Sequence, residues 1–328
     1  MSRSRVSLGV LFLLLLCQCD SAGTGEDSTT PPVGEPFSKI AFISNVDGLS
    51  QIFTMNPDGS DITQLTDDAG RKSHPDWSPD GRSLVFTVRA VDGTHELSLI
   101  DADGTNPRRL PNTRGEVNDP AWSPDGGRIA FSNRVDGNID VYVIDLDGGN
   151  LTRLTTHPAI DGNPDWAPDG SRLSFESKRD TSQPDHASIY TMNADGSNQQ
   201  QVFYTPELFC SSWSQEGSRI VFTSHRPPAG ASEPVTDLFS INPDGTDLQR
   251  VTQGEAFDLY ASYSPDGLQI AYLKAIGGDF RIYVIDADGS NERRIAGRGQ
   301  VDEDPAWSPS IDPATSSRNQ VSHQIRFL

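Results

Sequence analysis

The feature that most constrains the fold is a short motif that recurs six times. Each copy places an aromatic residue before Ser-Pro-Asp-Gly or a close variant, as in WSPDG at residues 77–81. The aromatic residues are Trp77, Trp122, Trp166, Trp213, Tyr263 and Trp307, and they lie 44 to 50 residues apart. A second marker, Asp-Gly after an apolar run, keeps a similar spacing. Its aspartates are Asp58, Asp103, Asp147, Asp195, Asp244 and Asp288. Such a period is typical of solenoids and propellers.

Each unit contains four short strand-like runs. In the unit of Trp122 the runs are 120–123, 128–133, 140–145 and 151–155. Apolar and polar residues alternate in the second and third runs, as in half-buried strands. Asp-Gly turns supply the positive φ angles that tight hairpins need. The pattern therefore predicts an all-β fold, a six-bladed β-propeller with four antiparallel strands per blade over residues 37–309.

The two markers are out of phase at the ends of this region. The unit at 39–66 has no aromatic-Ser-Pro strand before it, and the strand at Trp307 has no blade after it. Joined, the two parts make one complete blade. We therefore predict that the C-terminal strand joins the N-terminal blade and closes the ring, which removes the open sheet edges of a linear array. Truncation before Asp304 is expected to open this ring.

Residues 1–18 have the pattern of a secretory signal peptide. Two arginines precede an apolar run at 6–16, which is too short to cross a bilayer as a helix. Cys17 and Cys19 follow this run directly. An apolar run that ends in Leu and then Cys resembles the lipobox of bacterial lipoproteins. This resemblance implies lipidation of Cys19, with Cys17 as the alternative, whereas an ordinary cleaved signal would give a secreted protein.

The segments that flank the propeller are polar. Residues 19–36 are rich in Gly, Ser, Thr, Pro and acidic residues, so we expect a flexible tether. Residues 310–328 form a C-terminal tail with a start rich in Ser and Asn. These features predict a location at the bacterial cell envelope, on its periplasmic or surface side, with membrane contact only through a lipid anchor.

The repeat resembles a known one. The order P-x-W-S-P-D-G, an I-A-F strand, an I-Y-x-x-D-x-D-G hairpin and R-L-T is similar to the PD40 (WD40-like) repeat of the TolB-like propellers, over residues 37–309. The resemblance implies the same kind of propeller. It also implies recognition of protein partners, because TolB-like propellers bind proteins.

No catalytic motif stands out. The sequence has no G-x-S-x-G, H-E-x-x-H, P-loop or C-x-x-C, and no two of its six histidines show metal-ligand spacing. We therefore predict a non-enzymatic binding or scaffold protein. The alternative is an envelope enzyme, a glycan lyase or hydrolase, with a metal-assisted site assembled across blades at the central channel. Cys210 is expected to be a small buried strand residue.

No cofactor is assigned, although calcium is a further candidate. Turns such as Asp101-x-Asp103-Gly-x-Asn106 carry oxygen ligands of the kind that calcium prefers. Tight hairpins favour Asp-Gly whether or not a metal binds. The structural role of these turns is therefore the simpler interpretation.

The expected binding face carries the loops that lead into the innermost strands. Length variation concentrates there, in the loops 178–187 and 225–236, and variable loops on a rigid scaffold usually carry recognition. The residues expected at the channel mouth are His74, Asp119, Asp161, Asn163, Asp258, Asp302, Glu303 and Asp304. An acidic mouth favours a cationic group or a metal ion. The net charge of −20 disfavours nucleic acid, so the predicted partner is a protein or peptide bound by a monomer.

Overall fold

The computed structural model describes residues 38–113, 115–179, 186–206, 208–225, 235–254, 256–295 and 302–311. These residues form 24 strands and no helix, which confirms the all-β prediction. Within the same ranges there is accordingly no helix with the length and apolar character to cross a membrane. Contacts between Cα atoms divide the chain into 1–33 and 34–328, and only the second unit contains described residues. The signal peptide, Cys17, Cys19 and the tether at 19–36 lie outside them.

Four sheets have four strands each. The first contains β24 (Asp302–Trp307), β1 (Ile40–Val46), β2 (Leu49–Met55) and β3 (Thr63–Gln64). The second contains β4 (Arg71–Trp77), β5 (Ser83–Arg89), β6 (His95–Asp101) and β7 (Arg108–Arg109). The third contains β8 (Val117–Trp122), β9 (Arg128–Val135), β10 (Asn138–Asp145) and β11 (Thr152–Arg153). The fourth contains β12 (Asp161–Trp166), β13 (Arg172–Ser177), β14 (His186–Asn193) and β15 (Gln200–Pro206).

The remaining strands share a single eight-stranded sheet, so the prediction of six separate blades is wrong. The sheet contains β16 (Leu208–Trp213), β17 (Ile220–His225), β18 (Thr236–Ile241), β19 (Gln249–Arg250), β20 (Phe257–Tyr263), β21 (Gln269–Ile276), β22 (Asp279–Asp286) and β23 (Arg293–Arg294). Thr236 pairs in parallel with Phe257, and its hydroxyl donates to the Asp258 carbonyl at 3.1 Å. Four blades therefore stand as separate four-stranded sheets. The other two four-stranded groups are joined by this bridge, which links the third strand of one group to the first strand of the next.

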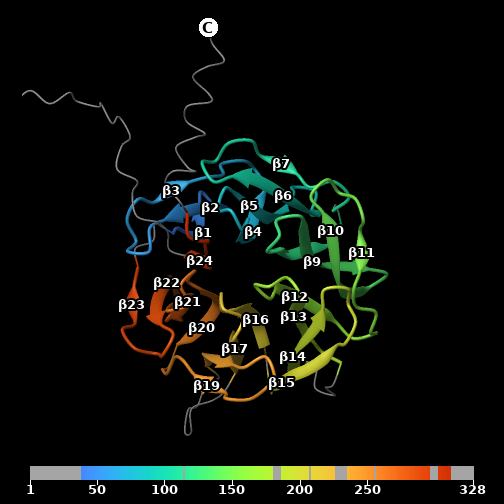
Figure 1. Ribbon diagram of the computed structural model, residues 1–328. Helices are drawn as coiled ribbons and strands as arrows, with labels where there is room; N and C mark the ends of the chain where they lie inside the picture. Colours follow the sequence, from blue (N-terminus) through green and yellow to red (C-terminus); the bar gives the residue numbers. More distant parts are fainter. Residues whose placement is uncertain are drawn as a thin grey trace, which may run out of the picture. The chain divides into compact units, whose positions relative to one another are not determined.

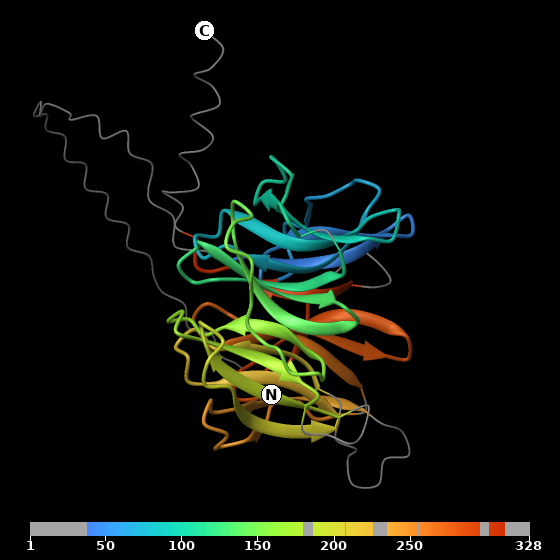
Figure 2. The ribbon, with the colours of Figure 1, turned by 90° about the vertical axis from the view of Figure 1, so that its right-hand side faces the viewer.

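The ring is closed by strands from opposite ends of the propeller. As predicted, β24 pairs antiparallel with β1, with Ile40 opposite Trp307 and Ser44 opposite Asp302. The backbone of Lys39 extends this pairing, because its carbonyl accepts from Ser308 N and its N–H donates to Ser308 Oγ, both at 2.8 Å. Figure 1 shows the sheets around a centre to which β4, β12, β16, β20 and β24 lie nearest, and Figure 2 shows the same sheets from the side.

The recurring Ser-Pro-Asp-Gly sequence builds the turn between the first two strands of a repeat. In the turn after β8, Ser123 Oγ donates to Asp125 Oδ1 at 2.6 Å and accepts from the N–H of Arg128 at 2.9 Å. Gly126 donates to the carbonyl of Ser123 at 2.8 Å and takes a φ of 74°, which favours glycine. Every polar residue of the motif therefore has a partner inside the turn, which gives the motif a structural role.

The core consists of apolar clusters in which side chains of successive repeats meet, and the aromatic landmark belongs to such a cluster each time. The landmarks are 4% to 8% exposed. Arg128 of one repeat stacks on Trp166 of the next, with its guanidinium carbon 4.9 Å from the ring centroid. This cation–π contact adds to the apolar burial. The landmark residues therefore hold neighbouring repeats together.

Candidate functional site

The innermost strand of every repeat contains a bulge at the same place. In β4 the pairing register shifts between Ser73 and Asp76, and equivalent shifts occur where β8, β12, β16, β20 and β24 pair with their neighbours. A bulge leaves a residue outside the ladder and re-aims the side chains next to it. Proline follows the bulge residue in four of the strands, where its missing N–H is not needed for pairing.

One residue in each bulge adopts a left-handed backbone. These residues are His74, Asp119, Asn163, Cys210, Tyr260 and Asp304, with φ between 42° and 54°. Asp and Asn tolerate this conformation, whereas His, Cys and Tyr adopt it less readily. The bulge places all these side chains around the centre of the ring. The fold therefore imposes the backbone geometry at six equivalent positions, while the side chains differ from repeat to repeat.

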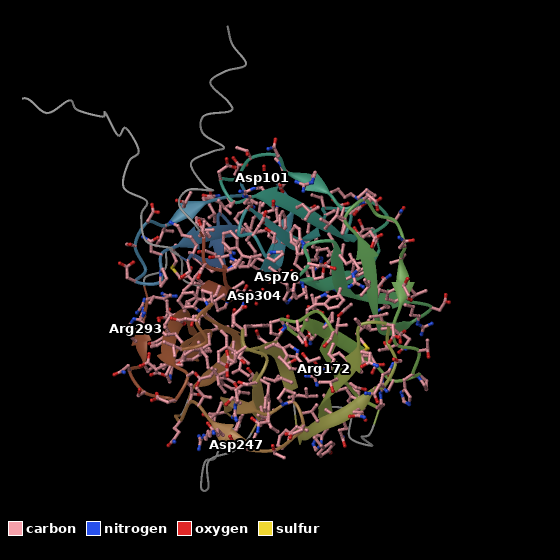
Figure 3. All side chains as sticks on the ribbon, viewed as in Figure 1. Asp76, Asp101, Arg172, Asp247, Arg293 and Asp304 are labelled. Atoms are coloured by element: carbon pink, nitrogen blue, oxygen red, sulfur yellow. The ribbon has the colours of Figure 1, made fainter. Side chains whose placement is uncertain are left out.

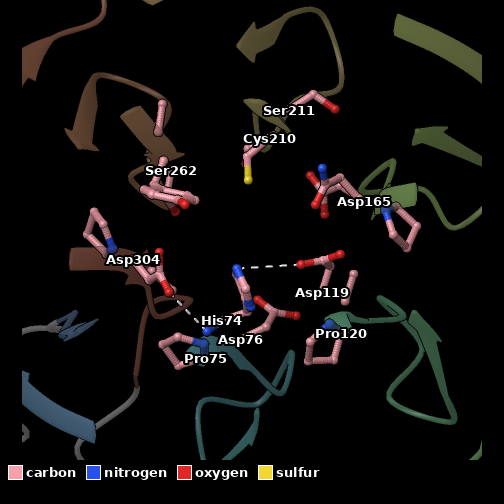
Figure 4. Close-up of a pocket in the computed structure, with 18 residues that line it drawn as sticks. His74, Pro75, Asp76, Asp119, Pro120, Asp165, Cys210, Ser211, Ser262 and Asp304 are labelled. Atoms are coloured by element: carbon pink, nitrogen blue, oxygen red, sulfur yellow. Dashed lines mark hydrogen bonds and ion pairs between the residues drawn. The ribbon is translucent and has the colours of Figure 1, made fainter. Parts of the chain in front are cut away.

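These side chains line a central cavity of about 140 Å³. Each innermost strand contributes its bulge residue and the two residues that follow. Figure 4 shows the labelled side chains around this space, and Figure 3 places Asp76 and Asp304 at the centre, with Asp247 and Arg293 near the periphery. One water needs about 10–15 Å³ on this scale, so the cavity has room for about ten waters or for the end of one long side chain.

His74 is the basic residue of the lining, and acidic groups surround it. Its Nε2 lies 3.5 Å from Asp119 Oδ1, and its backbone N–H donates to Asp304 Oδ2 at 3.2 Å. Burial lowers the pKa of His74, but the charges of Asp304, Asp119 and Glu303 outweigh burial and leave this pKa above its usual value. These charges therefore favour the protonated imidazole over the neutral form.

Two further carboxylates, Asp76 and Asp165, line the cavity one residue before an aromatic landmark. Asp76 accepts the backbone N–H of Trp122 at 2.6 Å, and Asp165 accepts that of Trp213 at 2.9 Å, so each links its repeat to the next. Burial raises the pKa of Asp76 to about 6 and that of Asp165 to about 7, although these hydrogen bonds oppose the shift. Both groups therefore change charge near neutral pH.

The part of the lining formed by β16 and β20 is neutral. It consists of Cys210, Ser211, Ser212, Tyr260, Ala261 and Ser262. Cys210 lies in a strand, as expected, but it is half-buried and lines the cavity, so the expectation that it is buried is corrected. Burial raises the pKa of its thiol well above the usual value, and nearby carboxylates add to this. A neutral thiol is a weak nucleophile, so the surroundings do not favour covalent chemistry at Cys210.

The residues predicted from sequence divide into two groups. His74, Asp119, Asn163 and Asp304 line the cavity together. The other four do not line it: Asp161, Asp258 and Asp302 are at most 1% exposed, and Glu303 is partly buried beside Asp304.

The buried aspartates have partners that explain their position. Asp161 forms an ion pair with Arg179 at 2.7 Å, and Asp258 lies 3.7 Å from Lys274 Nζ. Buried carboxylates with cationic partners are expected in interfaces that hold sheets together. Partner binding by any of the predicted residues stays a prediction. The central parts of the two variable loops, 180–185 and 226–234, lie outside the described residues.

Sequence analysis missed several cavity residues, among them Asp76, Asp165, Cys210 and Tyr260. Their signal was available, because the bulge residue lies three positions before the aromatic landmark in each repeat, and Asp76 and Asp165 lie one position before it. An internal alignment of the six motifs, read for differences instead of similarities, would have found these positions.

Across the described ranges, no group of three or more His, Cys, Asp or Glu side chains is placed to hold a metal ion. The turn proposed for calcium uses its oxygens internally: Asn106 donates to Asp101 Oδ2 at 2.7 Å, and Asp103 Oδ1 accepts Thr105 N at 2.9 Å. Calcium binding at these turns stays a prediction.

The described strands form a β-propeller around a central cavity, and comparisons with known proteins show what this chain is similar to. Residues 93–233 match the family described as Tricorn protease N-terminal β-propeller domain. The Tol-Pal system protein TolB of Anaeromyxobacter dehalogenans is 32% identical over 120 residues, a match that covers 36% of this chain and 26% of TolB. This chain therefore spans about a quarter of that relative's length.

Solved structures support the fold. The crystal structure of TolB from Acinetobacter baumannii superposes with a TM-score of 0.72 at 19% identity and covers 85% of this chain and 68% of that one. An oligogalacturonate lyase in complex with manganese gives a TM-score of 0.50 at 16% identity, with 78% and 72% covered. At such identities the likeness concerns the fold alone.

Proposed function

We propose that this protein is a non-enzymatic binding propeller of the bacterial cell envelope, which recognises a protein or peptide partner at the mouth of its central channel. The observation that carries the proposal is the cavity itself, where the fold gathers one side chain from each of six bulges. The similarity to the Tol-Pal system protein TolB supports a protein partner. The proposed lipid anchor at Cys19 rests on the sequence pattern.

The chemistry of the cavity favours binding over catalysis. A nucleophile needs a base within hydrogen-bond reach and a neighbour that orients this base. The Cys210 thiol is held neutral, and the nearest acidic oxygen to His74 Nε2 lies at 3.5 Å, in Asp119. The residues present therefore support recognition of charge more directly than they support bond breaking.

The second candidate is a glycan lyase, and the likeness to the oligogalacturonate lyase fold is the observation that favours it. The charge of the cavity argues against this candidate, because four carboxylates would repel a polyanionic sugar. An assay of the purified protein on oligogalacturonate, with and without manganese, tests it. Release of unsaturated products, which absorb ultraviolet light, would establish the lyase and overturn the binding proposal.

The binding proposal is tested by capture from envelope extracts of the source bacterium. The bait is the full chain, and the matched bait carries Asp119→Asn and Asp304→Asn, which preserve shape and tolerate positive φ. We expect one protein to be enriched by the native bait and lost from the variant. Capture of no specific protein, in repeated extracts with in-situ crosslinking, would contradict the proposal.

A further inference from the structure

The cavity lining is acidic on one side and neutral on the other. Its four carboxylates, those of Asp76, Asp119, Asp165 and Asp304, come from β4, β8, β12 and β24. Strands β16 and β20 contribute the uncharged side chains of Cys, Ser, Tyr and Ala residues. A guest must therefore present positive charge to one wall and an uncharged surface to the other. Lysine and arginine side chains combine a cationic end with an apolar stem.

His74 is the one basic side chain beside these four carboxylates, because no lysine or arginine lines the cavity within the described part of the chain. Asp119 Oδ1 lies 3.5 Å from His74 Nε2, and Asp304 Oδ2 accepts the backbone N–H of His74. The carboxylates therefore outnumber the nearby cationic side chain. In a confined space they attract a positive guest more strongly than carboxylates in open water do.

The size of the cavity limits the guest to one side chain. Its volume of about 140 Å³ cannot hold a folded segment or a helix, whereas an extended side chain can enter from the mouth. A metal ion alone would not use the neutral wall of Cys210 and Tyr260.

We propose that the central cavity accepts a single lysine or arginine side chain of the protein partner. Its charged end contacts Asp119, Asp165 and Asp304, and its stem lies against Cys210 and Tyr260. This inference rests on the proposed function and names the chemical group by which the partner is recognised.

The test uses two probes with the same four-carbon side-chain stem: N-acetyl-lysine methylamide, which carries an ammonium group at its end, and the uncharged N-acetyl-norleucine methylamide, which lacks it. Their binding to the full chain is measured by ligand-observed NMR, with N-acetyl-arginine methylamide as the second cation. We expect the lysine probe to bind about tenfold to a hundredfold more tightly than norleucine, the range of a charge-assisted contact. The variant Asp119→Asn/Asp304→Asn should lose this preference, while Asp136→Asn, in an exposed turn, should keep it.

Several outcomes would overturn the inference. Equal binding of lysine and norleucine probes would do so, as would no binding of either cation or an unchanged preference in the double variant. Thermal melting first confirms that each variant is folded. The envelope capture separates the two proposals. If the double variant still captures the partner, the proposed cationic guest is wrong and the proposed function stands. If the lysine probe is preferred but no partner is captured, the proposed function is wrong and the cationic guest stands.

Discussion

Replacement of Asp165 by asparagine should stabilise the protein at alkaline pH and leave its stability nearly unchanged in acid. Burial raises the pKa of Asp165 from 3.8 to about 7. In the window between these values the folded chain binds more protons than the unfolded chain, so the free energy of unfolding falls as the pH rises. Above this pH window the free energy of unfolding falls no further on account of Asp165. Asparagine carries no charge and can still accept the N–H of Trp213.

The expected magnitude follows from the shift. Each pKa unit corresponds to about 1.36 kcal/mol, so a shift of about three units sets an upper limit of about 4 kcal/mol at pH 8. Water in the cavity, which Asp165 borders, reduces this gain. The charge of Asp76 contributes to the shift, so the gains of Asp76→Asn and Asp165→Asn should not add.

Urea unfolding followed by tryptophan fluorescence, at about pH 5 and about pH 8, measures the difference. The native chain should lose stability between the two values relative to Asp165→Asn. The control is Asp136→Asn, whose residue is exposed in a turn at φ 52° and should follow the native profile. A variant that is equally or less stable than the native chain at pH 8 would refute the reasoning, because the carboxylate would then be stabilising.

Three further predictions concern the scaffold. Trp307→Ala should cost about 3–5 kcal/mol in denaturant unfolding, because this side chain is 8% exposed and closes the ring; a cost below 1 kcal/mol would show that the closing strand contributes little. Gly196→Ala should lower the free energy of unfolding by about 2 kcal/mol or more, because φ is +83° and a Cβ would lie 2.7 Å from a carbonyl oxygen. The control Gly93→Ala has a similar φ but open space around its Cβ, so it should lower this free energy less. Equal losses in the two variants would contradict the steric reasoning. Arg179→Ala should lower the free energy of unfolding by about 3–5 kcal/mol at pH 7, because it leaves the buried Asp161 carboxylate without its cation. The double variant Arg179→Ala/Asp161→Ala should recover part of that loss. No recovery would show that the loss comes from packing instead of charge.

The strands and the closure of the ring were predictable because they follow from local chemistry that repeats. Alternating residues, Asp-Gly turns and the phase difference between the two markers all point to the same arrangement, so β24 could be paired with β1 before any coordinates were known. The bridge between Thr236 and Phe257 could not be predicted. It depends on how closely two edges approach, and a single pair of residues leaves no periodic signal.

The site was only half predictable, and the bulge explains why. Acidic residues near the start of the innermost strands were predicted to lie at the channel mouth. Of these, Asp119 and Asp304 line the cavity, whereas Asp161 and Asp258 are buried. Strand periodicity gives the direction of a side chain only while the pleat is regular. A bulge resets that direction, so residues on its two sides cannot be assigned to one face by counting. His74 was placed correctly because it is the bulge residue itself.

The pairing of β1 with β24 also affects how the chain can fold during synthesis. Ile40 is made early, and its partner Trp307 is made 267 residues later. The apolar edge of β1 therefore stays unpaired while the intervening repeats form. Contacts of such large sequence separation are slow to form, so closure is expected to be a late step. The ring can close only after β24 has been synthesised. A chain that lacks β24 keeps an unpaired strand edge, which proteases and chaperones can recognise.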